Sequence, residues 1–124
     1  MNVIDSSGWL EYFIGGKNAD FFAPVIEDTK NVIVSAISIY DVVKRTLVEK
    51  NRDDALEAIA IMYEGKIIDV DREIALMAAE LSWELKLPMA DSIILATARL
   101  NNATLWTQDS HFEGMRDVKY RKPS

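Results

Sequence analysis

The chain has 124 residues, the usual size of one domain, and 49% of them are hydrophobic, which suffices for a buried core and argues against disorder. Fourteen basic and 20 acidic residues give a net charge of −6, which argues against non-specific nucleic-acid binding over a broad surface but not against a local acidic site. The absence of cysteine excludes disulfides and thiolate metal sites. No signal peptide and no apolar run of roughly 20 residues is present, which predicts a cytoplasmic protein without membrane contact. We expect a single domain over residues 1–124.

Strands and helices alternate from the N-terminus onward. Residues 1–5 (MNVID) predict a short strand that ends in a carboxylate, and Ser6-Ser7-Gly8 then leads into a helix closed by Gly15-Gly16. A second helix is expected at about residues 19–28. The β-branched run VIVS at residues 32–35 is typical of a strand buried on both faces of a parallel sheet.

The middle of the chain continues this alternation. Ser38 is the predicted N-cap of a helix that runs to Val48, and a second helix follows at about residues 54–63. Residues 66–70 (KIIDV) predict the third strand. Asp71 is then the expected N-cap of a helix that runs to Leu85.

The C-terminal third begins with a helix that has Pro88 in its first turn and Asn101-Asn102 as its C-cap and turn. Residues 103–107 (ATLWT) predict a buried strand, which the turn-forming residues Gln108-Asp109-Ser110 end. Residues 117–120 predict a short edge strand. Strands that alternate with helices throughout the chain predict an α/β fold, with a parallel sheet covered by helices on both faces.

Four carboxylates occupy equivalent places in this pattern. Asp5 and Asp109 follow strands, while Asp41 and Asp91 lie in the predicted first turns of helices. In an open α/β sheet, all four can meet outside the carboxyl ends of the strands. Mutually repelling carboxylates without a fixed lysine or histidine form a hard-cation site, which suits Mg²⁺ or Mn²⁺.

Each acid also has a local structural explanation. Asp5 can cap the first helix, and Asp41 follows Ser38 at a spacing close to that of a capping box. Asp91 can complement a helix dipole, and Asp109 can form an Asx turn. The coincidence of all four favours the metal site.

Four segments together resemble the PIN domain, and more narrowly the VapC-type toxins of bacterial and archaeal toxin–antitoxin pairs: MNVIDSS, the acidic residue after VSAIS, LPMADSIILATA, and ATLWTQDSHF. The resemblance implies a three-layer α/β/α sandwich with a mainly parallel sheet and metal-dependent endoribonuclease activity on an RNA substrate. It also implies control by a small antitoxin that blocks the active site.

Transferred position by position, the resemblance implies catalytic roles for the four acids, metal binding by three of them, and supporting polar residues beside them. The catalytic positions are Asp5, Asp41, Asp91 and Asp109, the expected ligands of Mg²⁺ or Mn²⁺ are Asp5, Asp91 and Asp109, and the supporting residues are Ser6, Ser7 and Thr107. The family usually has Glu where this chain has Asp41, whose carboxylate reaches about 1.5 Å less far, roughly one C–C bond.

Other conspicuous residues have ordinary explanations. His111, the single histidine, is expected to be a turn residue, and Trp9, Trp83 and Trp106 are expected in the core or at an interface. The apolar run at residues 58–63 fits either a helix packed on two sides or an interface with an antitoxin or with a second copy in a homodimer. The basic residues of two further stretches are expected on a solvated surface, although they have the charge to contact RNA phosphates: Lys44, Arg45, Lys50 and Arg52, and Arg116, Lys119, Arg121 and Lys122.

Two rival functions come from other classes of protein. The first is a catalytically inactive PIN-like module that binds RNA or protein, which the short side chain of Asp41 makes plausible. The second is a phosphoacceptor receiver domain, which is also α/β with an acidic Mg²⁺ pocket. Receivers typically have an acidic pair at the first strand and a lysine after a late strand, whereas this chain has Val3-Ile4-Asp5 and Thr107-Gln108-Asp109 there.

Overall fold

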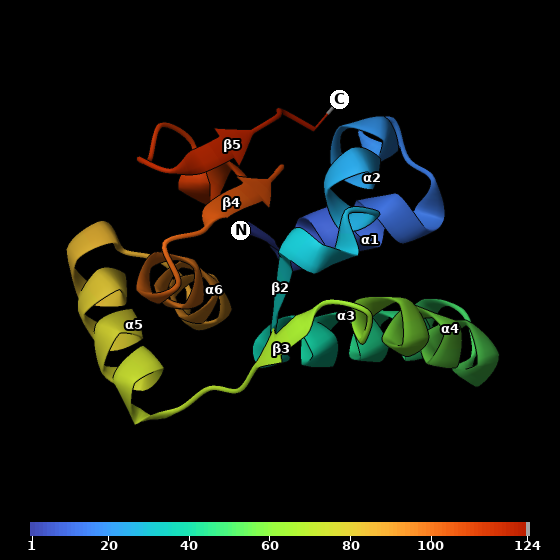
Figure 1. Cartoon of the computed structure of the whole chain (residues 1–124), viewed down its shortest axis with the longest axis horizontal. Helices are drawn as coiled ribbons and strands as arrows, with labels where there is room; N and C mark the ends of the chain where they lie inside the picture. Colours follow the sequence, from blue (N-terminus) through green and yellow to red (C-terminus); the bar gives the residue numbers. More distant parts are fainter. Residues whose placement is uncertain (124) are drawn as a thin grey trace.

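The computed structural model describes residues 1–123, and in them strands and helices alternate as predicted (Figure 1). The elements in chain order are β1 (Asn2–Ile4), α1 (Ser6–Ile14), α2 (Ala19–Ile26), β2 (Val32–Ser35), α3 (Ala36–Glu49), α4 (Arg52–Met62), β3 (Lys66–Ile68), α5 (Arg72–Leu85), α6 (Met89–Leu100), β4 (Thr104–Thr107) and β5 (Val118–Tyr120), with 3-10 turns at Thr29–Asn31 and Ser110–Phe112.

All five strands form one parallel sheet in the order β3-β2-β1-β4-β5. The predicted parallel sheet is therefore confirmed, and so is the edge strand at its C-terminal end. In the register of the sheet, Val3 of β1 lies between Ile33 of β2 and Leu105 of β4. This order differs from the flavodoxin-like order 2-1-3-4-5 of receiver domains, which place β1 beside β3.

Hydrophobic side chains fill both faces of the sheet. Val3 and Ile33 point to the face covered by α5 and α6, where they pack with Ile94 and Leu95. The next residue of β1, Ile4, points to the opposite face, which α1–α4 cover. Figure 1 shows α5 and α6 on one side of the sheet and α1–α4 on the other. The α/β/α sandwich thus follows from central strands whose apolar side chains point alternately to the two faces of the sheet.

Two helix starts differ from the predicted ones. Helix α3 begins at Ala36, directly after the last residue of β2, so the prediction that Ser38 is its N-cap is wrong. Ser38 is instead buried inside the helix, and Asp41 lies in the second turn rather than the first. Similarly, Pro88 immediately precedes the first residue of α6 instead of lying in its first turn. A strand that passes into a helix without a loop leaves no turn signal in the sequence.

Two predicted helix ends are confirmed in atomic detail. The Asp71 side chain caps α5 by accepting a hydrogen bond of 2.9 Å from the Ile74 amide. Gly15 ends α1 in the left-handed conformation, with φ of 66°, which glycine adopts without a steric penalty.

Of the residues predicted for the core or an interface, some are buried and others are exposed. Trp9 is buried, whereas Trp83 on α5 is 80% exposed. Of the apolar run on α4, Ala58 and Met62 belong to the core and Tyr63 is exposed. No helix within residues 1–123 is long and apolar enough to cross a membrane.

Candidate metal centre

Asp5 lies at the carboxyl end of β1, the central strand, and is also the N-cap of α1. Its side chain is 2% exposed and accepts hydrogen bonds from the Gly8 amide (2.9 Å), the Ser7 hydroxyl (2.7 Å) and the Thr107 hydroxyl (2.7 Å). A Cβ at Gly8 would lie 2.6 Å from Ile4, so only glycine allows α1 to begin this close to the strand. Asp5 therefore caps α1, as its local structural explanation expects, and it also lies at the carboxyl edge of the sheet.

Burial raises the pKa of Asp5 to about 6, although its three hydrogen bonds lower it and the charge of Asp109 raises it slightly. The charged form of this carboxyl group is thus destabilised by its loss of hydration, and a nearby cation would offset that cost. A buried carboxyl group with a strongly perturbed pKa at a sheet edge is a typical feature of functional sites.

A second group of side chains forms beside the N-terminus of α6. Asp91 lies in the first turn of that helix, and Asp109 follows β4 at the start of a 3-10 turn. The His111 ring stands against both acids, with its Nδ1 atom 2.8 Å from an Asp91 oxygen and 3.1 Å from an Asp109 oxygen. One ligand atom from each of these three residues lies within 4.8 Å of the others, a spacing that a single metal ion can bridge.

The pKa values in this group reflect burial and mutual charge. Burial raises the pKa of Asp91, the nearby Asp109 charge raises it further, and the hydrogen bond from His111 lowers it. The hydrogen bond to Asp91 and the charge of Asp109 together raise the pKa of His111. When protonated, the imidazole is a positive partner for two carboxylates that repel each other.

His111 is the residue of this group that sequence reasoning did not assign to the site. The expectation that it belongs to a turn is correct for its backbone, because its amide donates to Asp109 Oδ1 at 2.9 Å. The same Asx turn, however, directs the ring back to Asp91 on another element. In the sequence, the only feature that pointed to a site role for His111 was its position two residues after the turn residue Asp109.

Thr107 connects the two groups. Its hydroxyl donates to Asp5 and accepts a hydrogen bond of 2.9 Å from the Asp109 amide. The backbone after β4 is also held near α1, since the Gln108 amide lies 3.4 Å from the Ser7 oxygen. Asp5 and Asp109 are consequently fixed on either side of one buried threonine.

Asp41 reaches this region through a hydroxyl group. The Ser6 hydroxyl, one residue after Asp5, donates to an Asp41 oxygen at 2.8 Å and lies 3.4 Å from the Ser38 hydroxyl. Asp41 is not a member of the three-residue group of Asp91, Asp109 and His111. Of the four predicted acids, the structure thus brings Asp91 and Asp109 together, joins Asp5 to them through Thr107, and holds Asp41 at Ser6.

The donor set fits a hard divalent cation. Carboxylate oxygens are the preferred ligands of Mg²⁺ and Mn²⁺, whereas imidazole is not. Asp91 and Asp109 supply such oxygens at one place, and the Asp5 carboxylate, which accepts three hydrogen bonds, still has lone pairs available. The arrangement offers a cation negative charge from several elements at the carboxyl edge of the sheet.

Comparisons with known proteins identify the family of the chain and its fold. A family model described as the PIN domain matches residues 3–118. No curated protein matches the chain. Among solved structures, a toxin–antitoxin complex from Klebsiella pneumoniae contains a similar chain with 24% identity and a TM-score of 0.82, covering 96% of each chain.

Two further solved structures share the fold at lower identity. FitAcB from Neisseria gonorrhoeae is 21% identical with a TM-score of 0.75, covering 99% of this chain and 98% of that one. VapC20 from Mycobacterium tuberculosis, described as a toxin that cleaves the sarcin-ricin loop, is 13% identical with a TM-score of 0.71, covering 91% of this chain and 92% of that one.

Proposed function

The chain belongs to the PIN-domain family, and from this premise we propose that it is a Mg²⁺- or Mn²⁺-dependent endoribonuclease that acts as the toxin of a VapC-type toxin–antitoxin pair. The observation that carries the proposal is the meeting of Asp91 and Asp109 within a single metal-sized site, with Asp5 linked to them by Thr107. The toxin role rests on the likeness to chains from solved toxin–antitoxin complexes.

In this proposal Asp5, Asp91 and Asp109 hold the cation. Such an ion, when bound, supplies positive charge for a phosphodiester oxygen and lowers the pKa of water. The residues around the acids keep the ligands in place. Ser7 and Thr107 fix the two oxygens of Asp5, and the Asp109 amide fixes Thr107 in turn. The His111 ring contacts Asp91 and Asp109 and is assigned no ligand role.

Removal of divalent metal tests this function. Purified protein is expected to cleave single-stranded RNA with Mg²⁺ or Mn²⁺ and to stop when EDTA is added, because in this proposal the cation lowers the pKa of the attacking water and stabilises charge on the phosphodiester. Gel analysis of a labelled RNA measures the cleavage, and restored activity after excess Mn²⁺ controls for damage by the chelator. Undiminished cleavage in EDTA would exclude the proposed mechanism.

Asp41 is assigned a supporting catalytic role because the Ser6 hydroxyl turns its carboxylate toward the residue next to Asp5. Its position in the second turn of α3 removes the explanation that it merely complements the start of a helix. The remaining structural explanation is the hydrogen bond to Ser6 by itself.

Substitution of Asp41 distinguishes these roles. Asp41→Glu is expected to preserve or raise the cleavage rate, because one more methylene extends the carboxylate toward the site, while Asp41→Ala should lower both the rate and the apparent affinity for Mg²⁺. Cleavage measured against Mg²⁺ concentration gives both quantities. Identical titrations for the three proteins, with Asp41→Ala less stable by about 1 kcal/mol, would show that Asp41 serves only as the acceptor for Ser6.

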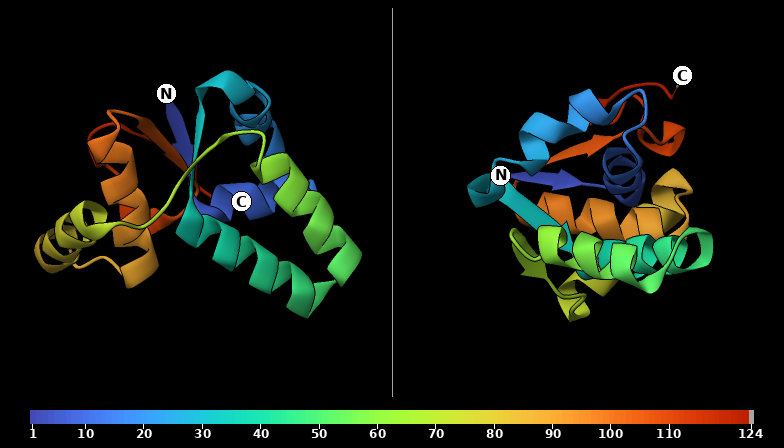
Figure 2. Two further views of the ribbon diagram at one scale, coloured as in Figure 1. Left: turned by 60° about the horizontal axis from the view of Figure 1, so that its bottom comes forward. Right: turned by 90° about the vertical axis from the view of Figure 1, so that its right-hand side faces the viewer.

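The proposed antitoxin and a second copy of the chain both require an apolar surface. Helices α3 and α4 pair in an antiparallel manner and extend beyond the sheet (Figure 2). Their outer faces expose Leu47, Val48, Leu56 and Tyr63. Exposed apolar residues gathered on one arm are typical of protein interfaces.

We expect the exposed apolar faces of α3 and α4 to mediate self-association of the chain into a homodimer. Sedimentation of the purified chain at tens of micromolar should give the mass of two copies, and Leu47→Glu with Leu56→Glu should shift it toward one copy by placing charge in the apolar surface. A wild-type protein that remains a strict monomer under these conditions contradicts the homodimer.

A further inference from the structure

A groove of about 570 Å³ runs along α1 and α3, beside the two serines that follow Asp5. Ser6, Ser7 and Asp41 line it where α1 begins, and Tyr40, Lys44, Arg45 and Glu49 line it along α3. The volume lies within the ~300–1,000 Å³ typical of sites for small ligands, so it has room for one nucleotide. Because the Ser7 hydroxyl donates to Asp5 at 2.7 Å, one residue of the groove contacts a proposed metal ligand.

The side chains of α3 in this groove combine an aromatic ring with two cations. Tyr40 is 56% exposed, and the Lys44 ammonium lies 5.7 Å from the centre of its ring. Within residues 1–123, Lys44 has no carboxylate partner within salt-bridge distance. Arg45 has one, Glu49 at 3.4 Å, and both of those side chains are more than half exposed. A phosphate can therefore reach both cations without displacing a buried ion pair.

We infer that this groove binds an unpaired nucleotide of the RNA substrate next to the scissile phosphate, with its base on the Tyr40 ring and its phosphate beside Lys44 and Arg45. The inference rests on the proposed ribonuclease function and names the side chains of this chain that hold the substrate beside the site. Base stacking on an exposed aromatic ring beside cations that follow the backbone is the usual means of binding single strands. A chain with a net charge of −6 needs such local cations to hold a polyanion.

Tyr40 provides the sharpest test, because it is exposed and its replacement leaves the core intact. With a labelled single-stranded RNA oligonucleotide, Tyr40→Leu is expected to raise KM by about 5-fold or more, the lower range of one base stacked on an aromatic ring, with a smaller change in kcat. Tyr40→Phe keeps the ring and should retain the wild-type KM. Trp83→Leu, which removes an exposed ring from α5, is the matched control and should not change KM.

Salt dependence provides the test for the cations. Lys44→Gln should weaken binding of the same oligonucleotide and reduce the slope of log affinity against log salt by about 0.7, the value for one phosphate contact on a single strand. Fluorescence anisotropy with EDTA present measures this binding without cleavage. It therefore separates failure of the inference from failure of the proposed function, which would show as wild-type protein that binds the RNA but never cleaves it.

Two results would overturn the inference. One is a wild-type KM and affinity for both Tyr40→Leu and Lys44→Gln in a protein that cleaves RNA. The other is unchanged RNA binding in Tyr40→Leu together with loss of self-association in sedimentation, which would assign Tyr40 to the protein interface on α3 and α4 instead.

Discussion

Asp91→Asn is expected to reduce RNA cleavage by at least about 100-fold, because a bound metal contributes several kcal/mol to the transition state and each 1.36 kcal/mol corresponds to a factor of ten. The variant should fold normally. The new amide can still accept the hydrogen bond from His111, and the substitution removes a partly buried charge that the Asp109 carboxylate repels. Cleavage rates at saturating Mg²⁺ and a melting curve measure the two effects.

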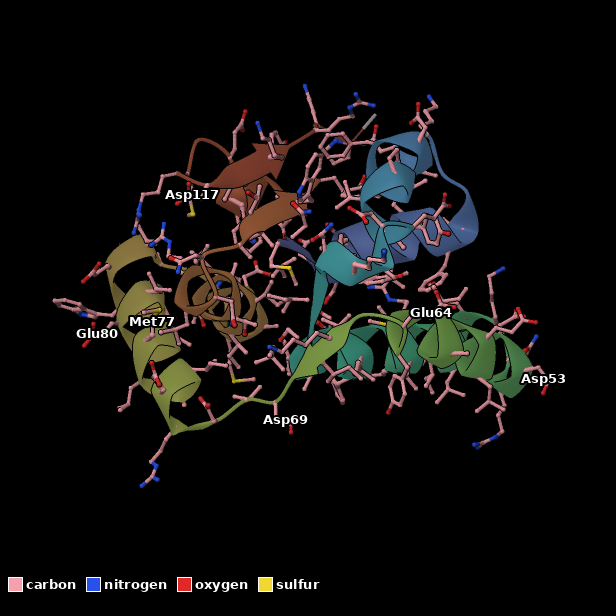
Figure 3. The ribbon with its side chains drawn as sticks, in the orientation of Figure 1. Asp53, Glu64, Asp69, Met77, Glu80 and Asp117 are labelled. Carbon is pink, nitrogen blue, oxygen red and sulfur yellow. The ribbon has the colours of Figure 1, made fainter. Side chains whose placement is uncertain are left out.

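Asp69→Asn is the matched control for this prediction. Asp69 also follows a strand, but it is exposed on the connection between β3 and α5, outside the acidic group (Figure 3). The Asp69→Asn variant should cleave RNA at the wild-type rate. A loss of activity in Asp91→Asn that accompanies a much lower melting temperature would make this acid a structural residue and contradict its catalytic role.

Asp5→Asn is expected to abolish cleavage and yet stabilise the protein at neutral pH. Raising the pKa of a buried carboxyl from 3.8 to about 6 corresponds to roughly 3 kcal/mol of unfavourable free energy for its charged form. Asparagine carries no charge and remains a good N-cap, so it keeps the bond from the Gly8 amide. It loses one acceptor for the Ser7 or Thr107 hydroxyl, which costs about 1 kcal/mol. The net gain at pH 7 is on the order of 1–2 kcal/mol.

The effect of pH on this gain has a definite sign. The folded-state pKa of Asp5 lies above the unfolded-state value, so its contribution to stability is fully present below about pH 4 and is lost as the pH rises through about 6. Asparagine does not titrate. The stability difference between Asp5→Asn and wild type should therefore be smallest near pH 4 and reach a plateau above about pH 6.

Asp71→Asn controls for the capping change alone, because Asp71 is an N-cap aspartate that is exposed. Denaturant unfolding of the three proteins between pH 4 and pH 8 makes the comparison. If Asp5→Asn unfolds more easily than wild type at pH 7, the Asp5 carboxylate contributes more to the fold through its hydrogen bonds than its burial costs.

The sequence was sufficient to predict the fold because the buried strands are mostly apolar and most of them are followed by a turn or a capping residue. VIVS at residues 32–35 is buried at all four positions, and Asp71 caps α5 as expected. The error at Ser38 arose where no turn separates two elements, since β2 passes directly into α3. A serine inside a helix resembles an N-cap when no turn precedes the helix.

The candidate site was predictable only in part. The places of Asp5, Asp91 and Asp109 at strand ends and a helix start follow from the alternation of elements, which requires no side-chain detail. The position of His111 depends instead on the path of one Asx turn. The link between Asp41 and Ser6 depends on the crossing of α1 over α3, which a single sequence does not specify.

Direct binding of Mn²⁺ tests the central claim, that the acids at the carboxyl edge of the sheet hold the catalytic cation. Electron paramagnetic resonance counts free Mn²⁺ during titration of wild type, Asp91→Asn and Asp69→Asn without RNA. We expect saturable binding to wild type and Asp69→Asn, and an affinity at least about 10-fold lower for Asp91→Asn, the smallest loss usual even for residues that only support a metal ligand. Equal Mn²⁺ affinity in all three proteins would contradict the claim.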